Sequence, residues 1–305
     1  MEHPVIVIAG PTASGKTGIG ARLAKQLKGE VISADSRQIY RHMNIGTATP
    51  QAAEQDGVPH HLLNFVDPVE RYSASRFARE ASGLIESILG RRRVPIVVGG
   101  SGFYLEALFT GLSEIPEISA ETRSRVETMV SDDAVAAHRA LEEVDPQAAA
   151  THPPSDPQRL SRALEVYQET GKPISWYRTH PRKPGTRREA LWFGLEWDRA
   201  ELYDRINERT LSMMSDGFVE EVSGLLESGY TRETYALKTF GYREICAMLQ
   251  GEMTEEDAVS AIQLGTRHYA KRQMTWFRNR SQLNWVQASG DPLETILSSL
   301  KGPRS

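Results

Sequence analysis

Short apolar runs alternate with amphipathic stretches over the first hundred residues. The runs at 5–9, 30–34 and 94–98 are four or five residues long and rich in β-branched side chains, a pattern typical of buried parallel strands. Residues 19–27 and 73–89 place apolar or small side chains at helical spacing. This alternation predicts an α/β fold in which helices flank a parallel sheet.

The pattern changes near residue 113. From there to about residue 184 the chain shows helical spacing interrupted by prolines and no convincing strand, and an apolar strand-like run resumes at 190–195. We therefore expect an all-helical domain at 113–189, inserted into an α/β core formed by residues 1–112 and 190–305. The expected helices of the insertion lie at 121–130, 133–143 and 157–169. In the second part of the core we expect helices at 199–228, 241–250, 254–279 and 292–300 and a strand at 283–287.

Composition narrows the class of protein. Of 305 residues, 39% are hydrophobic and 25% charged, as in ordinary globular proteins. The single cysteine, Cys246, excludes an internal disulfide and a cysteine-clustered zinc site. No apolar run approaches the roughly 20 residues that a membrane helix needs, and residues 1–4 lead directly into a strand without a signal peptide. These observations favour a cytoplasmic protein with no membrane partner.

Charge is segregated along the chain. The net charge of −4 argues against a general affinity for nucleic acid. However, residues 158–188 carry eight basic and two acidic side chains, and residues 267–280 carry five basic and no acidic ones. Trp176, Tyr177 and Trp276 lie among these positive charges. Basic residues interleaved with aromatic ones suit RNA, although solvated helix faces account for most charge runs.

Residues 10–17 match the phosphate-loop (P-loop) pattern G-x-x-x-x-G-K-[ST], and they lie between a predicted strand and a predicted helix, as that motif requires. Glycines allow close approach to a phosphate, and the helix N-terminus favours an anion. Lys16 supplies a positive charge, and Thr17 supplies a hydroxyl that can reach Mg²⁺. An ordinary glycine-rich turn is the alternative. The predicted phosphate-binding residues are Gly10, Pro11, Thr12, Ala13, Ser14, Gly15, Lys16 and Thr17.

One acidic residue ends a predicted strand at the same edge. The strand at 94–98 runs into Gly-Gly-Ser-Gly without an acid, whereas Asp35 follows the strand at 30–34. The carboxyl ends of parallel strands form the ligand-binding edge of such sheets, so residues 10–17, 35–38 and 99–104 should converge there. Asp35 could serve as a Mg²⁺ ligand, a general base or a helix cap.

Taken in order, nine segments resemble the tRNA dimethylallyltransferase family, the bacterial tRNA isopentenyltransferases, over residues 4–285. The matching segments are 10–17, 35–41 (Asp-Ser-Arg-Gln-Ile-Tyr-Arg), 45–50 (Ile-Gly-Thr-Ala-Thr-Pro), 58–62 (Val-Pro-His-His-Leu), 98–104 (Val-Gly-Gly-Ser-Gly-Phe-Tyr), 158–162 (Gln-Arg-Leu-Ser-Arg), 205–209 (Arg-Ile-Asn-Glu-Arg), 240–244 (Phe-Gly-Tyr-Arg-Glu) and 270–278 (Ala-Lys-Arg-Gln-Met-Thr-Trp-Phe-Arg). The phosphate loop alone occurs in many families, but the ordered set is highly specific.

The resemblance implies transfer of the dimethylallyl group from dimethylallyl diphosphate to N6 of the adenosine at position 37 of tRNA, beside the anticodon. It implies Mg²⁺ as cofactor, a phosphate loop that holds the diphosphate, and Asp35 as the base. Oligomeric state is not visible in the sequence, and we take a monomer as the default. Arg205 matches the catalytic arginine of the family, with Arg209 as the alternative. Thr12 matches a leaving-group contact, and Ser101 stands where the family usually has threonine.

The resemblance also implies a tRNA surface, with the target base flipped out of its stack. The matching residues are Asp35, Ser36, Arg37, Gln38, Ser101, Arg123, Gln158, Arg159, Leu160, Ser161, Arg162, Lys238, Thr239, Phe240, Gly241, Tyr242, Arg243, Lys271, Arg272, Gln273, Met274, Thr275, Trp276, Phe277 and Arg278.

Two other functions use the same motifs. A phosphate-loop kinase of a small metabolite would bind ATP tightly and ignore tRNA. A non-catalytic RNA-binding protein with a relic phosphate loop would tolerate loss of Asp35.

Overall fold

The computed structural model describes residues 4–113, 115–180, 182–183 and 185–301, and the chain divides into two compact units. One unit comprises Met1–Thr110 and Thr186–Ser305, and the other comprises Gly111–Gly185. These limits lie close to residues 112 and 190, where the sequence pattern changes. Each unit has a hydrophobic core of its own.

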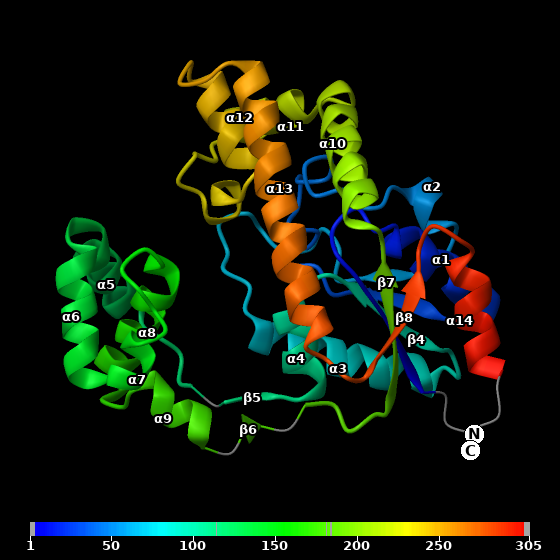
Figure 1. The fold of residues 1–305 in the computed structure, drawn as a ribbon, viewed down its shortest axis with the longest axis horizontal. Helices are drawn as coiled ribbons and strands as arrows, with labels where there is room; N and C mark the ends of the chain where they lie inside the picture. The colour runs from blue at the N-terminus through cyan, green and yellow to red at the C-terminus, as the bar shows by residue number, and fades with distance from the viewer. Residues whose placement is uncertain (1–3, 114, 181, 184, 302–305) are drawn as a thin grey trace. The chain divides into compact units, whose positions relative to one another are not determined.

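The first unit is built on a six-stranded, fully parallel sheet in the order β3-β2-β4-β1-β7-β8. Figure 1 labels β4, β7 and β8 of this sheet. The strands are β1 (Val5–Ala9), β2 (Glu30–Ser33), β3 (His60–His61), β4 (Pro95–Gly99), β7 (Ala190–Glu196) and β8 (Leu283–Gln287). The central strand β1 is buried throughout, which explains its unbroken apolar sequence. The predicted α/β class and parallel sheet are confirmed.

Helices cover both faces of this sheet. α1 (Lys16–Leu27) and α14 (Pro292–Lys301) contact each other and pack on one face, where Ile6, Ile8 and Ile96 point. α3 (Ala74–Gly90) contacts β2 and β4, and α4 (Gly102–Phe109) packs against α3. Successive side chains of a strand point to opposite faces of the sheet. Since helices cover both faces, the side chains on both faces are apolar.

Four α-helices of this unit lie between β7 and β8 in the chain. They are α10 (Arg199–Ser215), α11 (Phe218–Glu227), α12 (Tyr242–Leu249) and α13 (Glu255–Arg278). The expected single helix at 199–228 is wrong: it breaks at Gly217, whose φ of 97° lies in the left-handed region. α13 lies beside α10 (Figure 1).

Several short elements have no strong sequence signal. They are α2 (Ala52–Gln55), the edge strand β3, α4 and the 3₁₀ turn at Tyr235–Lys238. Each is too short to show a recognisable repeat of apolar residues in the sequence, so tertiary contacts decide its conformation. Within the described residues, no helix is long and apolar enough to cross a membrane.

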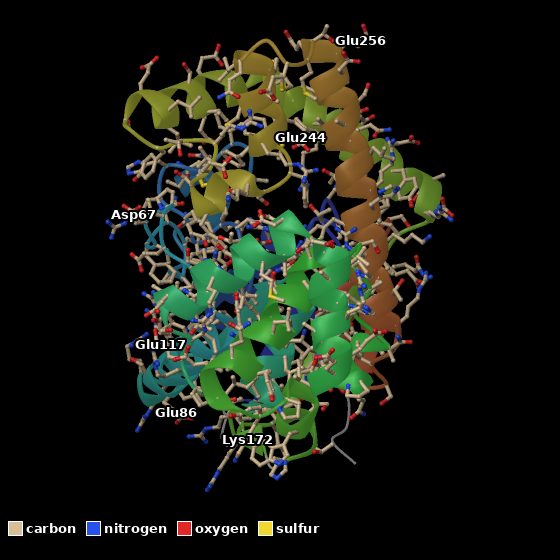
Figure 2. The ribbon with its side chains drawn as sticks, turned by 90° about the vertical axis from the view of Figure 1, so that its left-hand side faces the viewer. Asp67, Glu86, Glu117, Lys172, Glu244 and Glu256 are labelled. Atoms are coloured by element: carbon tan, nitrogen blue, oxygen red, sulfur yellow. The ribbon has the colours of Figure 1, made fainter. Side chains whose placement is uncertain are left out.

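The second unit is helical apart from a two-residue ladder between β5 (Leu112–Ser113) and β6 (Arg182–Lys183). Its helices are α5 (Ala120–Asp132), α6 (Ala134–Val144), α7 (Pro146–Ala149), α8 (Pro157–Thr170) and α9 (Ile174–Thr179). Ser119, Asp133 and Asp156 each accept a hydrogen bond from the first turn of the helix they cap. Lys172, labelled in Figure 2, places its Nζ 3.8 Å from the ring centroid of Trp176.

Candidate functional site

The loop at 10–17 joins the end of β1 to the start of α1. Gly15 caps α1 with a φ of 82°, and a glycine has no side chain with which to bond the amides of the first helical turn. The helix dipole makes an anion a favourable ligand for these amides. The hydroxyl of Ser14, buried in the same loop, likewise lacks a partner within the described part of the chain.

Lys16 lies inside this loop with 9% of its surface exposed, and its Nζ donates a hydrogen bond to the carbonyl of Pro11 at 3.1 Å. Burial lowers the pKa of Lys16 to about 8. Asp35 opposes this shift, and Arg209 adds to it. Since burial and a second cation disfavour its charge, Lys16 gains more from a bound anion than an exposed lysine would.

Two arginines of α10 reach the loop, and they do so differently. Arg205 donates its Nε–H to the backbone carbonyl of Ala13 at 3.0 Å and lies 4.4 Å from the ring centroid of Trp197. The indole of Trp197 donates to the carbonyl of Ser14 at 3.1 Å. Arg205 and Trp197 thus hold the backbone of the loop.

Arg209, one turn further along α10, instead meets a side chain. Its guanidinium donates a hydrogen bond to Oγ1 of Thr12 at 2.5 Å. Burial lowers the pKa of Arg209 to about 10, with Asp35 opposing the shift and Arg205 adding to it. Arg209 therefore belongs to the same electrostatic cluster as Lys16 and Asp35.

Gln273 of α13 fastens the loop from the other side. Its Oε1 accepts from the amide of Thr12 at 2.8 Å, and its Nε2 donates to the carbonyl of Gly100 at 2.8 Å. A Cβ at Gly100 would lie 2.3 Å from that Nε2, and a Cβ at Gly99 would lie 2.1 Å from the carbonyl oxygen of Ala34. The backbone of Ala34 leaves no room for a side chain at Gly99, the last residue of β4, so no acid can stand there.

Asp35 follows β2, and the residues after it are held in a turn. Its Oδ1 accepts from the amide of Arg37 at 2.9 Å, while the amide of Ser36 donates to Oγ of Ser101 at 3.0 Å. Tyr269 of α13 lies near this pair: burial raises its pKa to about 12, the Asp35 charge raises it further, and the Arg37 charge and a hydrogen bond with Ser101 oppose the shift. The strand ends after β1, β2 and β4 therefore meet, as predicted.

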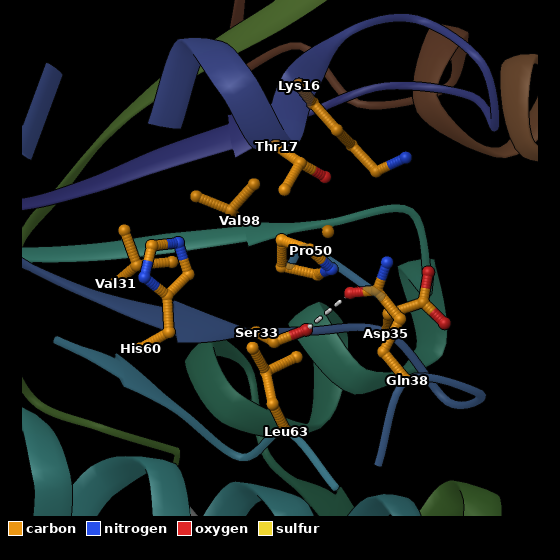
Figure 3. A pocket seen from close by; sticks show the side chains of 11 residues that line it. Lys16, Thr17, Val31, Ser33, Asp35, Gln38, Pro50, His60, Leu63 and Val98 are labelled. Atoms are coloured by element: carbon orange, nitrogen blue, oxygen red, sulfur yellow. Dashed lines mark hydrogen bonds between the residues drawn. The ribbon is translucent and has the colours of Figure 1, made fainter. Parts of the chain in front are cut away.

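A narrow cavity of about 10 Å³ lies where these strand ends meet (Figure 3). Lys16, Thr17 and Asp35 line it together with apolar side chains such as Val31 and Val98. It has room for about one water molecule. The cavity therefore marks the point of convergence, and a larger ligand must occupy its mouth or widen it.

The residues matched to a tRNA surface divide by exposure. Within α12, α13 and the segment before α12, the exposed ones are Lys238, Arg243, Lys271, Arg272, Thr275 and Arg278; Phe240, Met274 and Trp276 are half-buried. Buried in the same region are Thr239, Gly241, Tyr242, Gln273 and Phe277. Buried side chains cannot meet a macromolecule on the surface, so we assign these five to packing and positioning.

The same division holds at the β2 edge and in the second unit. Asp35, Ser36 and Arg37 are half-buried, whereas Gln38 and Ser101 are buried. On α8, Gln158, Arg159 and Arg162 are exposed, Ser161 is half-buried and Leu160 lies in the core. Arg123 is half-buried and donates to the carbonyl of Ile118 at 3.3 Å.

Sequence reasoning missed three residues at this site. Trp197 follows the end of β7, so the rule on strand ends would have drawn attention to it. Tyr269 lies inside the basic segment at 267–280, so the same pairing of aromatic and basic residues that drew attention to Trp276 could have found it. Glu221 of α11 had no sequence signal, and its contacts appear only in the folded chain.

The fold and this cluster define an α/β protein whose parallel sheet carries a cationic loop and one carboxylate at its carboxyl edge. A family model described as IPP transferase matches residues 38–280, and one described as isopentenyl transferase matches residues 3–64. The tRNA dimethylallyltransferase 1 of Citrifermentans bemidjiense is 44% identical over 293 residues, covering 96% of this chain and 94% of that protein. The tRNA dimethylallyltransferase of Geobacter sulfurreducens is 43% identical over 301 residues, covering 98% and 97%.

Solved structures are consistent with the matches to the family models and to these relatives. The tRNA isopentenylpyrophosphate transferase of Bacillus halodurans aligns with a TM-score of 0.71 at 38% identity, over 98% of this chain and 94% of that one. A eukaryotic dimethylallyltransferase acting on tRNA aligns with a TM-score of 0.81 at 28% identity, over 99% and 81%. The chain belongs to the tRNA dimethylallyltransferase family, also described as the IPP transferases.

Proposed function

We propose that this protein transfers the dimethylallyl group of dimethylallyl diphosphate to N6 of an adenosine in tRNA, at position 37 beside the anticodon, and releases diphosphate. Family membership supports the transfer to tRNA adenosine. The observation that supports the chemistry is the convergence of Lys16, Arg209 and Asp35 around one loop.

The base in this proposal is Asp35. The N6 lone pair of adenine is delocalised into the ring, so removal of an N6 proton during attack assists the reaction. As the bond between N6 and C1 of the prenyl group forms, the bond between C1 and the diphosphate oxygen breaks. The Asp35 carboxylate accepts the N6 proton, and the departing electron pair stays on the diphosphate.

The leaving group is held by the loop at 10–17. Amides of the first turn of α1 and the Lys16 ammonium bind the diphosphate, and Arg209 stabilises the negative charge that grows on it. Arg209 suits this role better than Arg205, because Arg209 reaches the Thr12 hydroxyl while Arg205 is engaged with the Ala13 carbonyl. Ser101 positions the turn after Asp35 through the Ser36 amide.

Mg²⁺ fits the donors present. Thr17 and Asp35 offer oxygen ligands at one cavity, and Mg²⁺ commonly takes one or two protein oxygens together with substrate phosphates and water. When bound, Mg²⁺ would neutralise charge on the diphosphate. The hydroxyl of Thr17 is the protein ligand that we propose.

The tRNA would meet the exposed positive side chains around α13 and α8. Lys271 and Arg272 are exposed on α13, and Arg159 and Arg162 on α8, where the uncharged Gln158 is exposed beside them. Such contacts neutralise phosphates, and aromatic neighbours can stack on unpaired bases. Since all proposed reacting groups come from one chain, we propose that the monomer is the active form. We also propose that it acts in the cytoplasm, where tRNA is found.

The test is mass spectrometry of nucleosides from unmodified tRNA incubated with the protein, Mg²⁺ and dimethylallyl diphosphate. Wild type should yield N6-dimethylallyladenosine, located by fragment sequencing beside the anticodon. Asp35→Asn keeps an oxygen for the Arg37 amide but removes the base, so its rate should fall by about 10²–10⁴-fold. Absence of the product with wild type, or an undiminished rate in Asp35→Asn, would contradict the proposal.

A further inference from the structure

Glu221 of α11 binds three consecutive backbone amides of another segment. Its Oε2 accepts from the amides of Asn44 and Ile45, both at 2.7 Å, and its Oε1 accepts from the amide of Gly46 at 3.2 Å. Successive amides that point into one concavity form a nest suited to an anion. Here a carboxylate from a distant part of the chain fills the nest.

The hydroxyl of Tyr242 adds a fourth hydrogen bond, to Oε1 of Glu221 at 2.6 Å. Burial raises the pKa of Tyr242 well above its usual value, and the Glu221 charge raises it further. The phenol therefore stays protonated and donates to the carboxylate.

The segment that Glu221 holds, residues 43–49, is packed as well as hydrogen-bonded. A Cβ at Gly46 would lie 2.2 Å from the ring of Phe218 and 2.7 Å from that of Tyr242. These two rings meet edge to face, with centroids 5.0 Å apart. Residues 43–49 thus lie directly on α11 and α12.

The same segment holds Gln38 from its other side. The Nε2 of Gln38 donates to the carbonyl of Ala48 at 2.8 Å, and its Oε1 accepts from the Ser33 hydroxyl at 3.2 Å (Figure 3). Gln38 lies three residues after Asp35, and the turn between them is held at its other end by Ser101. A continuous set of contacts therefore runs from Glu221 through residues 43–49 and Gln38 to the turn that carries Asp35.

We propose that Glu221 is a positioning residue for the reaction, which fixes residues 43–49 and, through Gln38, the Asp35 carboxylate. This inference rests on the proposed function. Within the described part of the chain, no hydrogen bond of residues 43–49 involves the loop at 10–17. Glu221 therefore acts on the base and leaves the hydrogen bonds of the diphosphate site in place. A small displacement of a catalytic group lowers the rate without lowering affinity for a substrate held elsewhere.

The experiment measures kcat and the KM for dimethylallyl diphosphate with the full chain, tRNA and Mg²⁺. In Glu221→Gln an amide NH₂ replaces one acceptor oxygen, and we expect kcat to fall about 10- to 100-fold while the donor KM stays within about twofold. Tyr242→Phe, which removes only the fourth hydrogen bond, should lower kcat by a smaller factor. Glu220→Gln is the matched control: the same change on the exposed neighbour in α11 should leave both constants as in wild type.

A double variant separates positioning from general destabilisation. If Glu221 acts through Asp35, adding Glu221→Gln to Asp35→Asn should slow the reaction no further. An equal fall in both backgrounds, or a wild-type kcat in both Glu221→Gln and Tyr242→Phe, would overturn the inference. Should Glu221→Gln fail to fold, Tyr242→Phe is measured instead, alone and combined with Asp35→Asn. The inference then stands only if Tyr242→Phe lowers kcat in the wild-type background and not in the Asp35→Asn background. A wild-type protein that forms no prenylated adenosine would instead refute the proposed function.

Discussion

At the scale of single residues, two arginines that lie four positions apart on α10 make different contacts with the loop at 10–17. Arg205 holds the loop backbone at Ala13, whereas Arg209 reaches the Thr12 side chain and is coupled to Asp35. Sequence spacing could not separate them, because both lie on one face of the helix.

We expect Arg209→Gln to lower kcat about 10²–10³-fold, the usual effect of removing one donor to a developing oxyanion. Arg205→Gln should lower it by less than about tenfold, because the charge nearest Thr12 remains. Single-turnover rates of both variants, measured with saturating dimethylallyl diphosphate, provide the comparison. The reverse ranking would restore Arg205 as the catalytic arginine.

The lowered pKa of Lys16 predicts a pH dependence. In the proposed reaction its ammonium form binds the diphosphate, so with a pKa of about 8 in the free protein the kcat/KM for the donor should fall as pH rises above about 8. A bound anion favours the ammonium form, so the corresponding fall in kcat should occur at higher pH. Profiles of both constants between pH 6 and 10 (roughly the range around that pKa) test this; a kcat/KM that stays flat through about pH 9 would rule it out.

At the scale of secondary-structure elements, α13 connects the sheet edge to the C-terminal helices. Its buried Gln273 bridges the strand ends after β1 and β4, while Lys271 and Arg272 on the same helix are exposed. One helix therefore carries a buried face that holds the strand ends and an exposed face that carries positive charge. The run of basic residues in the sequence did not show which positions belong to which face.

Gln273→Leu should lower the free energy of unfolding, because the Thr12 amide and the Gly100 carbonyl lose their partner. Each unsatisfied buried group costs about 1–3 kcal/mol. Gln263→Leu is the matched control: Gln263 is half-buried on α13 and makes one longer hydrogen bond, to the Asn207 carbonyl at 3.3 Å. Urea denaturation compares the two; an equal loss would mean that the Gln273 bridge contributes nothing special.

At the scale of the whole molecule, the second unit is an insertion whose two ends pair with each other. Ser113 and Arg182 pair across the β5–β6 ladder, and antiparallel partners lie about 5 Å apart. The two ends of the insertion therefore lie side by side, and the core cluster that includes Ile6, Ile96 and Leu293 is formed by residues of the first unit alone.

Replacing residues 114–181 by a short glycine-serine linker should leave a folded protein that still binds diphosphate. Its kcat/KM for tRNA should fall, and the dependence of tRNA affinity on salt should become shallower, because fewer phosphates are neutralised. Titrations of tRNA at several salt concentrations, with a circular dichroism melt to check folding, measure this. An unchanged salt slope would show that the insertion makes no phosphate contacts.

The sequence by itself determined the α/β class, the main strands and most long helices, and the family. Strands such as β1 are encoded by continuous apolar runs, and the loop at 10–17 by a local pattern, so neighbours in the chain carry the information. The break in the expected helix at 199–228 was the chief local error, because a glycine between two amphipathic stretches does not alone show whether the helix continues.

Tertiary structure decided which residues meet. Arg209 rather than Arg205 reaching Thr12, Gln273 bridging two strand ends, and Glu221 filling the nest at residues 44–46 all join segments that lie far apart in the chain. Such contacts depend on helix rotation and on close approaches allowed by Gly46, Gly99 and Gly100. No local pattern encodes them, because each side chain's partner is set by the packing of whole elements.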